Sequence, residues 1–164
     1  MKEIVYRHEN LRTTFTQEGE RPVAVIHESM DVALAVTRFP ESSREARIEA
    51  ARKEALITLR TPFDLGKGPL LRARLFVLGP NDHALVLCMH HIISDGWSVK
   101  NMFADLKRAF LAHQNREPLQ VSELPLTYID YARWFNSPRF LDYHAEFKPF
   151  WVDRLGGSPE VHGL

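Results

Sequence analysis

Two apolar runs, at 70–78 and 83–89, constrain the fold of this chain more than any other feature. The four residues GPND join them. Proline, asparagine and aspartate between apolar runs are typical of a tight turn, so the pair predicts an antiparallel hairpin. The second run, HALVLCM, is apolar at almost every position, which is typical of a strand covered on both faces. We therefore predict that this strand lies centrally in a sheet.

Short strands and helices also precede this hairpin. Apolar spacing predicts a helix, a first hairpin around a Glu-Gly-Glu turn and a further short strand, at 1–10, 13–27 and 31–39. Ser42 and Glu45 match a capping box for a helix that ends at Pro62. The predicted apolar face of that helix comprises Ile48, Ala51, Ala55, Leu56 and Leu59.

Helices dominate the chain after the hairpin. We expect one at about 97–113, with two more near 127–136 and 139–155. Pro149 should kink the last of these or open a new helix at Lys148. This mixture predicts an α/β fold, a sandwich of a mixed, largely antiparallel sheet with packed helices. The apolar stripe of the first helix comprises Val99, Met102, Phe103, Leu106 and Phe110.

Length and charge restrict the class of protein. The chain has 164 residues, enough for one domain. Its 21 Lys plus Arg balance its 21 Asp plus Glu, which argues against a nucleic-acid partner. No apolar run approaches the roughly 20 residues that span a bilayer, and frequent charges at the start argue against a signal peptide. We therefore expect no nucleic-acid partner and no membrane partner.

The single cysteine, Cys88, excludes an internal disulfide and a metal site built from several cysteines. Its neighbours are apolar, so a buried and inert thiol is a better interpretation than a nucleophile. A reducing cytoplasm is the expected location.

The stretch MHHIISDGWS, at 89–98, carries the most chemistry-bearing residues. In an extended segment His90 and His91 point to opposite faces, so only one of them can enter a given cleft. A neutral imidazole there is a suitable general base, because its unperturbed pKa of about 6.5 lies near working pH. Asp95 is placed to bind either a backbone N–H or an arginine, and Gly96 removes a side chain where another group must approach.

A structural interpretation of the same residues stays open. Two partly buried histidines could cap the strand, with Asp95 as the N-cap of the following helix. A metal site is less well supported, because adjacent histidines on a strand cannot easily bind one ion and no cysteine completes a ligand set.

Three motifs in order resemble the condensation domains of nonribosomal peptide synthetases, in the chloramphenicol-acetyltransferase-like superfamily. The first is RHENLRTTF, from Arg7 to Phe15, and the second is the H-H-x-x-x-D-G pattern within MHHIISDGWS. The third is YIDYARW, from Tyr128 to Trp134. The connecting stretches PFDLGKGPLLRARLF and FWVDRLGGSP also fit, so the resemblance covers essentially the whole chain.

The resemblance also predicts which part of the domain is present. The family's opening motif would precede Arg7, and the motifs of its second lobe would follow Leu164. We therefore expect residues 1–164 to form a partial condensation domain, most of the N-terminal lobe without the start of that lobe and without the C-terminal lobe.

The family joins an acyl or peptidyl thioester on one carrier protein to the amine of an aminoacyl thioester on another. By this resemblance His91 faces the tunnel and positions or deprotonates the amine, and His90 is structural. Asp95 forms a structural ion pair with Arg7 or Arg12, and Gly96 leaves room for the thioester. The implied partners are donor and acceptor carrier domains and the C-terminal lobe. Both carriers present 4'-phosphopantetheine, and neither a bound cofactor nor a metal is expected.

Further expectations follow for the remaining motif residues and for activity. Trp97 is expected in the core, and Tyr128, Asp130 and Trp134 are expected to pack before they serve function. Because the tunnel lies between two lobes, the isolated chain should be inactive, and its exposed inter-lobe face should drive self-association. The Asp95→Asn variant should melt at a clearly lower temperature.

Two alternatives stay open. A coenzyme A-dependent acyltransferase of the same superfamily shares H-x-x-x-D-G, although His90 and the first motif favour a condensation domain. A non-catalytic docking lobe or an epimerisation-type lobe is the other. The heterocyclising subgroup, which has aspartates in place of the histidines, is excluded by His90 and His91.

Overall fold

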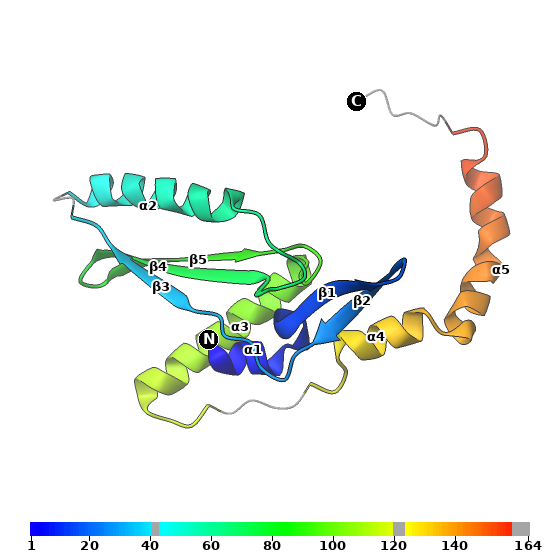
Figure 1. Ribbon diagram of the computed structural model, residues 1–164, viewed down its shortest axis with the longest axis horizontal. Helices are drawn as coiled ribbons and strands as arrows, with labels where there is room; N and C mark the ends of the chain where they lie inside the picture. The colour runs from blue at the N-terminus through cyan, green and yellow to red at the C-terminus, as the bar shows by residue number, and fades with distance from the viewer. Residues whose placement is uncertain (41–42, 120–123, 159–164) are drawn as a thin grey trace. The chain divides into compact units, whose positions relative to one another are not determined.

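The computed structural model describes residues 1–40, 43–119 and 124–158. The chain forms two compact units, Met1–Leu124 and Pro125–Leu164. The helices and strands are labelled along the chain in Figure 1. Strands and helices are mixed throughout the first unit, and the second unit is helical, which confirms the predicted α/β class.

The first unit opens with the predicted helix and hairpin. Helix α1 (Lys2–Arg7) is followed by the short 3₁₀ helix η1 (Glu9–Arg12). Strands β1 (Thr13–Glu18) and β2 (Arg21–Ile26) then pair antiparallel. Gly19 lies in the turn at φ +62, a conformation that glycine adopts without steric cost.

A three-stranded sheet forms the centre of the first unit. Strands β3 (Leu34–Arg38), β4 (Leu71–Gly79) and β5 (Asp82–Met89) lie in the order β3-β4-β5. The β4-β5 hairpin is antiparallel, as predicted, and β3 pairs parallel to β4. The prediction that 83–89 lies centrally is wrong for the described sheet, because β3 pairs with β4 and leaves β5 at an edge.

The pattern of β4 and β5 explains this error. The central strand β4 alternates, with Leu71, Ala73 and Phe76 buried and charged side chains between them. In β5, Leu85 is 39% exposed although its neighbours are apolar. The continuous apolar run at 83–89 therefore corresponds to a partly exposed edge strand and not to a strand that is covered on both faces. Cys88 on that strand is buried, as predicted.

Helix α2 (Arg44–Arg60) lies along one side of the sheet (Figure 1). Its observed N-cap is Ser43, whose side chain accepts a hydrogen bond from the Ala46 N–H. The predicted cap, Ser42, lies outside the described residues. The helix ends before Pro62, as predicted, but the predicted apolar face is only partly buried. Ala51 and Thr58 are buried, and Leu56, Ile57 and Leu59 are exposed.

The main core joins α1, the sheet and helix α3 (Gly96–Asn115). Leu70 and Leu71 are fully buried in it, and burying a side chain of this size contributes about 2 kcal/mol. Met102 provides the contact from α3. The core fixes α3 against the start of the chain, which positions the residues at the N-terminus of α3. Its buried members are Ile4, Val5, Leu11, Val32, Leu70, Leu71, Ala73, Ile93 and Met102.

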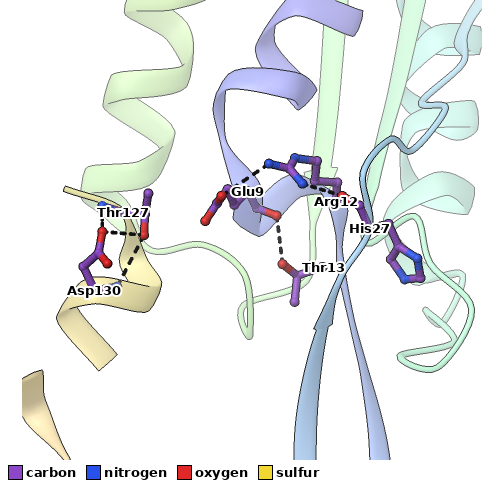
Figure 2. Close-up of polar contacts among 6 residues, drawn as sticks. All are labelled: Glu9, Arg12, Thr13, His27, Thr127 and Asp130. Carbon is purple, nitrogen blue, oxygen red and sulfur yellow. Dashed lines mark hydrogen bonds and ion pairs between the residues drawn. The ribbon is translucent and has the colours of Figure 1, made fainter. Parts of the chain in front are cut away.

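The second unit contains helices α4 (Tyr128–Phe135) and α5 (Pro138–Leu155). A capping box opens α4: the Thr127 side chain accepts from the Asp130 N–H, and the Asp130 carboxylate accepts from the Thr127 N–H (Figure 2). Helix α5 runs through Pro149, so the predicted new helix at Lys148 does not form. None of the helices in the described ranges is both long and apolar enough to cross a membrane.

The aromatic residues of the third motif do not form a buried core within this unit. Tyr128 and Trp134 are 60% and 51% exposed, so the expectation that they pack is met only by contacts between rings and not by burial. Their rings instead contact Tyr131, at centroid distances of 5.9 and 5.8 Å. Two helices alone offer too little surface to cover such large side chains.

Candidate active site

The histidine stretch forms a tight turn between the end of β5 at Met89 and the start of α3 at Gly96. The His90 N–H donates to the Leu70 carbonyl over 3.0 Å, at the base of β4. The Ile93 N–H then donates back to the His90 carbonyl over 3.1 Å. Ile93 is buried in the main core. These contacts anchor the turn at both ends.

The two histidine rings occupy different environments. His91 is exposed, and His90 is partly buried. The His90 Nδ1 accepts a hydrogen bond from the Ile92 N–H over 3.1 Å, which fixes the ring within its own turn. The prediction that the two rings face different surroundings is met, but by a turn after β5 and not by the alternation of an extended segment. The catalytic role of His91 stays a prediction.

A residue that sequence reasoning missed supports the His90 ring. Phe63 packs its ring edge-on against His90, with centroids 6.0 Å apart. The Arg72 guanidinium lies 3.8 Å from the centre of the Phe63 ring and donates to the Thr61 and Pro62 carbonyls, each over 2.6 Å. His90 is thus backed by a layer that comes from the loop after α2 and from β4. Only the fold brings these segments together, so the sequence carried no signal for this contact.

Asp95 is the N-cap of α3. Its Oδ1 accepts from the Ser98 N–H over 2.8 Å and from the Ser98 hydroxyl over 2.7 Å. The Ser98 N–H, and then its hydroxyl, hold the pKa of Asp95 below its ordinary value. Asp95 contacts no arginine among the residues that the structure describes, so the predicted ion pair with Arg7 or Arg12 is wrong here. The N-cap interpretation is the one observed, because the free N–H groups of the first turn are the nearest donors.

The residues after Asp95 lie on an open surface. A Cβ placed on Gly96 would meet nothing within 4 Å, so no contact in the described chain requires glycine there. The predicted approach of a substrate to Gly96 stays a prediction. Trp97 is 71% exposed, and the Lys100 Nζ lies 5.2 Å from its ring centre. The expectation that Trp97 joins the core is wrong, because it lies in the first turn of α3, which extends beyond the core.

Arg7, the first residue of the first motif, binds an acid that sequence reasoning missed. Its Nε donates to Asp105 Oδ2 over 3.1 Å, and His8 Nε2 lies 2.7 Å from the same oxygen. Arg108 Nη1 is 2.8 Å from the other oxygen, Oδ1. The Asp105 side chain is only 11% exposed. Its signal was visible in the sequence, since an acid that interrupts the apolar stripe of Met102 and Leu106 needs a partner.

Arg12 holds the first motif to the β1-β2 hairpin (Figure 2). Its guanidinium donates to the His27 carbonyl and to Glu9 Oε1, the latter over 3.4 Å. Thr13 Oγ1 donates to the Glu9 carbonyl over 2.8 Å, and Thr14 Oγ1 pairs with His27 Nε2 over 2.8 Å. The motif is therefore a connected polar structure beside the core. Arg7 and Arg12 serve structural contacts, as predicted, but with other partners.

Comparisons with known proteins agree with this geometry. The model of the Condensation domain family matches residues 1–164. A linear gramicidin synthase from Brevibacillus parabrevis is 38% identical over 164 residues, which is 100% of this chain and 3% of that protein. The chain therefore belongs to the condensation domain family.

Solved structures share the fold. The X-domain of teicoplanin biosynthesis, in its complex with OxyB, matches with a TM-score of 0.81 and 28% identity, over 99% of this chain and 35% of that one. The epimerization domain from the third module of tyrocidine synthetase B matches with a TM-score of 0.75 and 20% identity, over 98% of this chain and 36% of that one. The chain thus has the predicted chloramphenicol-acetyltransferase-like α/β sandwich fold and spans about a third of these solved chains.

Proposed function

We propose that this chain supplies the histidine-bearing lobe of a peptide-bond-forming condensation domain. The substrates are an acyl or peptidyl thioester and an aminoacyl thioester, each held on the 4'-phosphopantetheine arm of a carrier domain. The arms belong to the carriers, and the lobe holds no cofactor of its own. The observation that carries the proposal is the exposed His91 ring on a turn anchored at both ends.

The chemistry at His91 is one amide-forming transfer. The nitrogen of the acceptor amine attacks the thioester carbon of the donor, so a C–N bond forms and the C–S bond breaks. The amine loses one proton, and the leaving thiolate of the donor arm gains one. A neutral imidazole at this position can accept the proton of the attacking nitrogen and return it to the leaving thiolate. Holding the amine in line is the other contribution that the ring can make.

A second lobe completes the site in this proposal. Large apolar side chains lie exposed along α3, which follows the histidine turn: Trp97, Phe103 and Phe110 are 71%, 49% and 67% exposed. A covering lobe would exclude water, and electrostatic interactions strengthen in a drier site. The chain alone is therefore expected to be inactive and to self-associate through this apolar surface.

The test is a transfer assay with loaded donor and acceptor carrier proteins, followed by mass spectrometry of the dipeptidyl thioester. It compares the chain alone with the chain fused to the second lobe of a relative's condensation domain. We expect product only from the fusion, and the His91→Ala variant of the fusion should lose roughly 100-fold or more of the rate. The matched control is His113→Ala, which removes an exposed histidine at the other end of α3.

Several outcomes would contradict the proposal. Unchanged transfer by the His91→Ala fusion would remove the role of that ring. Turnover by the isolated chain that depends on His91 would show that no second lobe is required and that a second copy of the chain completes the site. Transfer from an acyl-coenzyme A, in place of the donor carrier, would favour the acyltransferase alternative. Loss of the α-hydrogen of the donor residue to solvent, without amide product, would favour an epimerisation-type lobe.

A further inference from the structure

We propose that Asp105 is a positioning residue, which sets the height and rotation of α3 and so holds the His91 turn in place. The inference rests on the proposed function of His91. It assigns a role to the Asp105 cluster, which consists of Asp105, Arg7, His8 and Arg108.

The cluster connects two segments that are far apart in the sequence. Arg7 ends α1 and His8 follows it, and both contact Oδ2 of Asp105, over 3.1 and 2.7 Å. Arg108 contacts Oδ1 from one turn further along α3 itself. The side chains of Asp105 and Arg7 are 11% and 12% exposed. Both carboxylate oxygens are thus in contact with nitrogen atoms, Oδ2 with the mostly buried Arg7 and His8 and Oδ1 with the more exposed Arg108.

These contacts define the placement of α3 more sharply than its apolar contacts do. A carboxylate that binds a guanidinium Nε and an imidazole nitrogen must face both, whereas the Met102 side chain is flexible and adapts to its surroundings. Asp105 lies ten residues after Asp95, which is about 15 Å along the helix axis. A helix is stiff over that length, so a shift at Asp105 moves the N-cap and the His91 turn with it.

The choice of an acid at this position supports a positioning role over a purely stabilising one. A leucine at 105 would continue the apolar stripe of Met102 and Leu106. Apolar replacement of all the charged members of a buried cluster often leaves stability unchanged or raises it, so stability alone does not require the charges. Apolar contacts are not directional, however, so a leucine would allow several heights and rotations of α3 against α1. The acid accepts one.

The first test measures the turn directly, by nuclear magnetic resonance of the full 164-residue chain. It records the hydrogen-exchange rate of the His90 amide, which donates to the Leu70 carbonyl at the base of β4, and the chemical shifts of the His91 ring. For Asp105→Asn we expect roughly tenfold faster exchange at the His90 amide, because a displaced turn weakens its hydrogen bond to Leu70, together with shifted His91 signals. The conservative variant Asp105→Glu keeps the charge and should restore most of the native values.

A destabilising variant elsewhere in the first unit separates positioning from general destabilisation. Ala51→Gly weakens α2 in the second core cluster, with Phe76 and Leu78, and touches no member of the Asp105 cluster. It should lower the melting temperature and leave the His90 exchange rate and the His91 signals native. If Asp105→Asn does not fold, His8→Ala removes one of the two contacts from the α1 side and should give a smaller change of the same kind.

The second test uses the transfer assay of the fused protein. Asp105→Asn should lower kcat by roughly 10- to 100-fold with the acceptor KM within about twofold, as a small misplacement of a reacting group does. Native His90 exchange and native His91 signals in both Asp105→Asn and His8→Ala would overturn the inference, whatever the transfer assay shows. An intact rate in His91→Ala would instead overturn the proposed function and leave the resonance test of Asp105 standing.

Discussion

Asp95 and Asp105 lie on the same helix, ten residues apart, and satisfy their carboxylates in opposite ways. Asp95 caps the first turn of α3 and takes both of its hydrogen bonds from Ser98, three residues on. Asp105 lies in the middle of α3 and takes its partners from Arg7 and His8, near the start of the chain, as well as from Arg108. One acid is exposed and locally satisfied, and the other is buried and satisfied by the tertiary structure.

The difference shows which partners a carboxylate needs in an exposed cap and in a buried position. A cap needs only the free N–H groups that every helix start provides. A buried carboxylate needs cationic or N–H partners, because burial without them costs several kcal/mol. Asp95, in the histidine motif, was expected to pair with Arg7 or Arg12. In the structure Arg7 pairs instead with Asp105, an acid outside that motif. The next three predictions test this division.

The largest effect is expected from Asp105→Ala. The variant loses the contacts of the carboxylate with Arg7 and His8 in a largely buried place, so the free energy of unfolding should fall by about 2 kcal/mol. Urea denaturation measures the change, and Asp142→Ala, at an exposed acid on α5, is the control with little expected loss. A loss below about 1 kcal/mol would mean that the Asp105 cluster behaves like a surface ion pair.

A smaller effect is expected from Asp95→Ala. Alanine cannot accept the Ser98 N–H, so the melting temperature should fall, but by less than in Asp105→Ala. The variant Asp95→Asn should melt close to the native protein, since asparagine caps about as well as aspartate. This replaces the expectation from the sequence, which assumed a buried ion pair. A large drop in the melting temperature of Asp95→Asn would instead support an ion pair between Asp95 and an arginine.

The smallest effect is the pH dependence that Asp95 confers. Its pKa is lowered in the folded protein, first by the Ser98 N–H and then by the Ser98 hydroxyl. A lowered pKa means that the charged cap stabilises the fold above the unfolded pKa, near 4, and that this contribution is lost as the pH falls through the folded value. The difference in melting temperature between the native protein and Asp95→Asn should stay constant down to about pH 5 and then change to the disadvantage of the native protein. A change that begins near neutral pH would contradict the assignment to Asp95.

The sequence by itself determined the elements and the local contacts of this protein. Turn chemistry around GPND and apolar spacing predicted the β4-β5 hairpin, α1 and α3 close to their observed bounds. The different surroundings of His90 and His91 were also predicted, although a turn and not an extended strand produces them. The N-cap of Asp95 was among the interpretations that the residues left open. These features depend on residues within a few positions of one another, so a short stretch contains their physical cause.

The tertiary structure alone decided which distant segments meet. It placed β4 rather than β5 at the centre of the sheet, paired Arg7 with Asp105, and set Phe63 behind His90. It also left Trp97 in the open, although its side chain favours a core. Each of these outcomes depends on the relative placement of segments that are tens of residues apart. Local patterns state that a side chain must be covered or paired, and only the packed chain determines which partner is within reach.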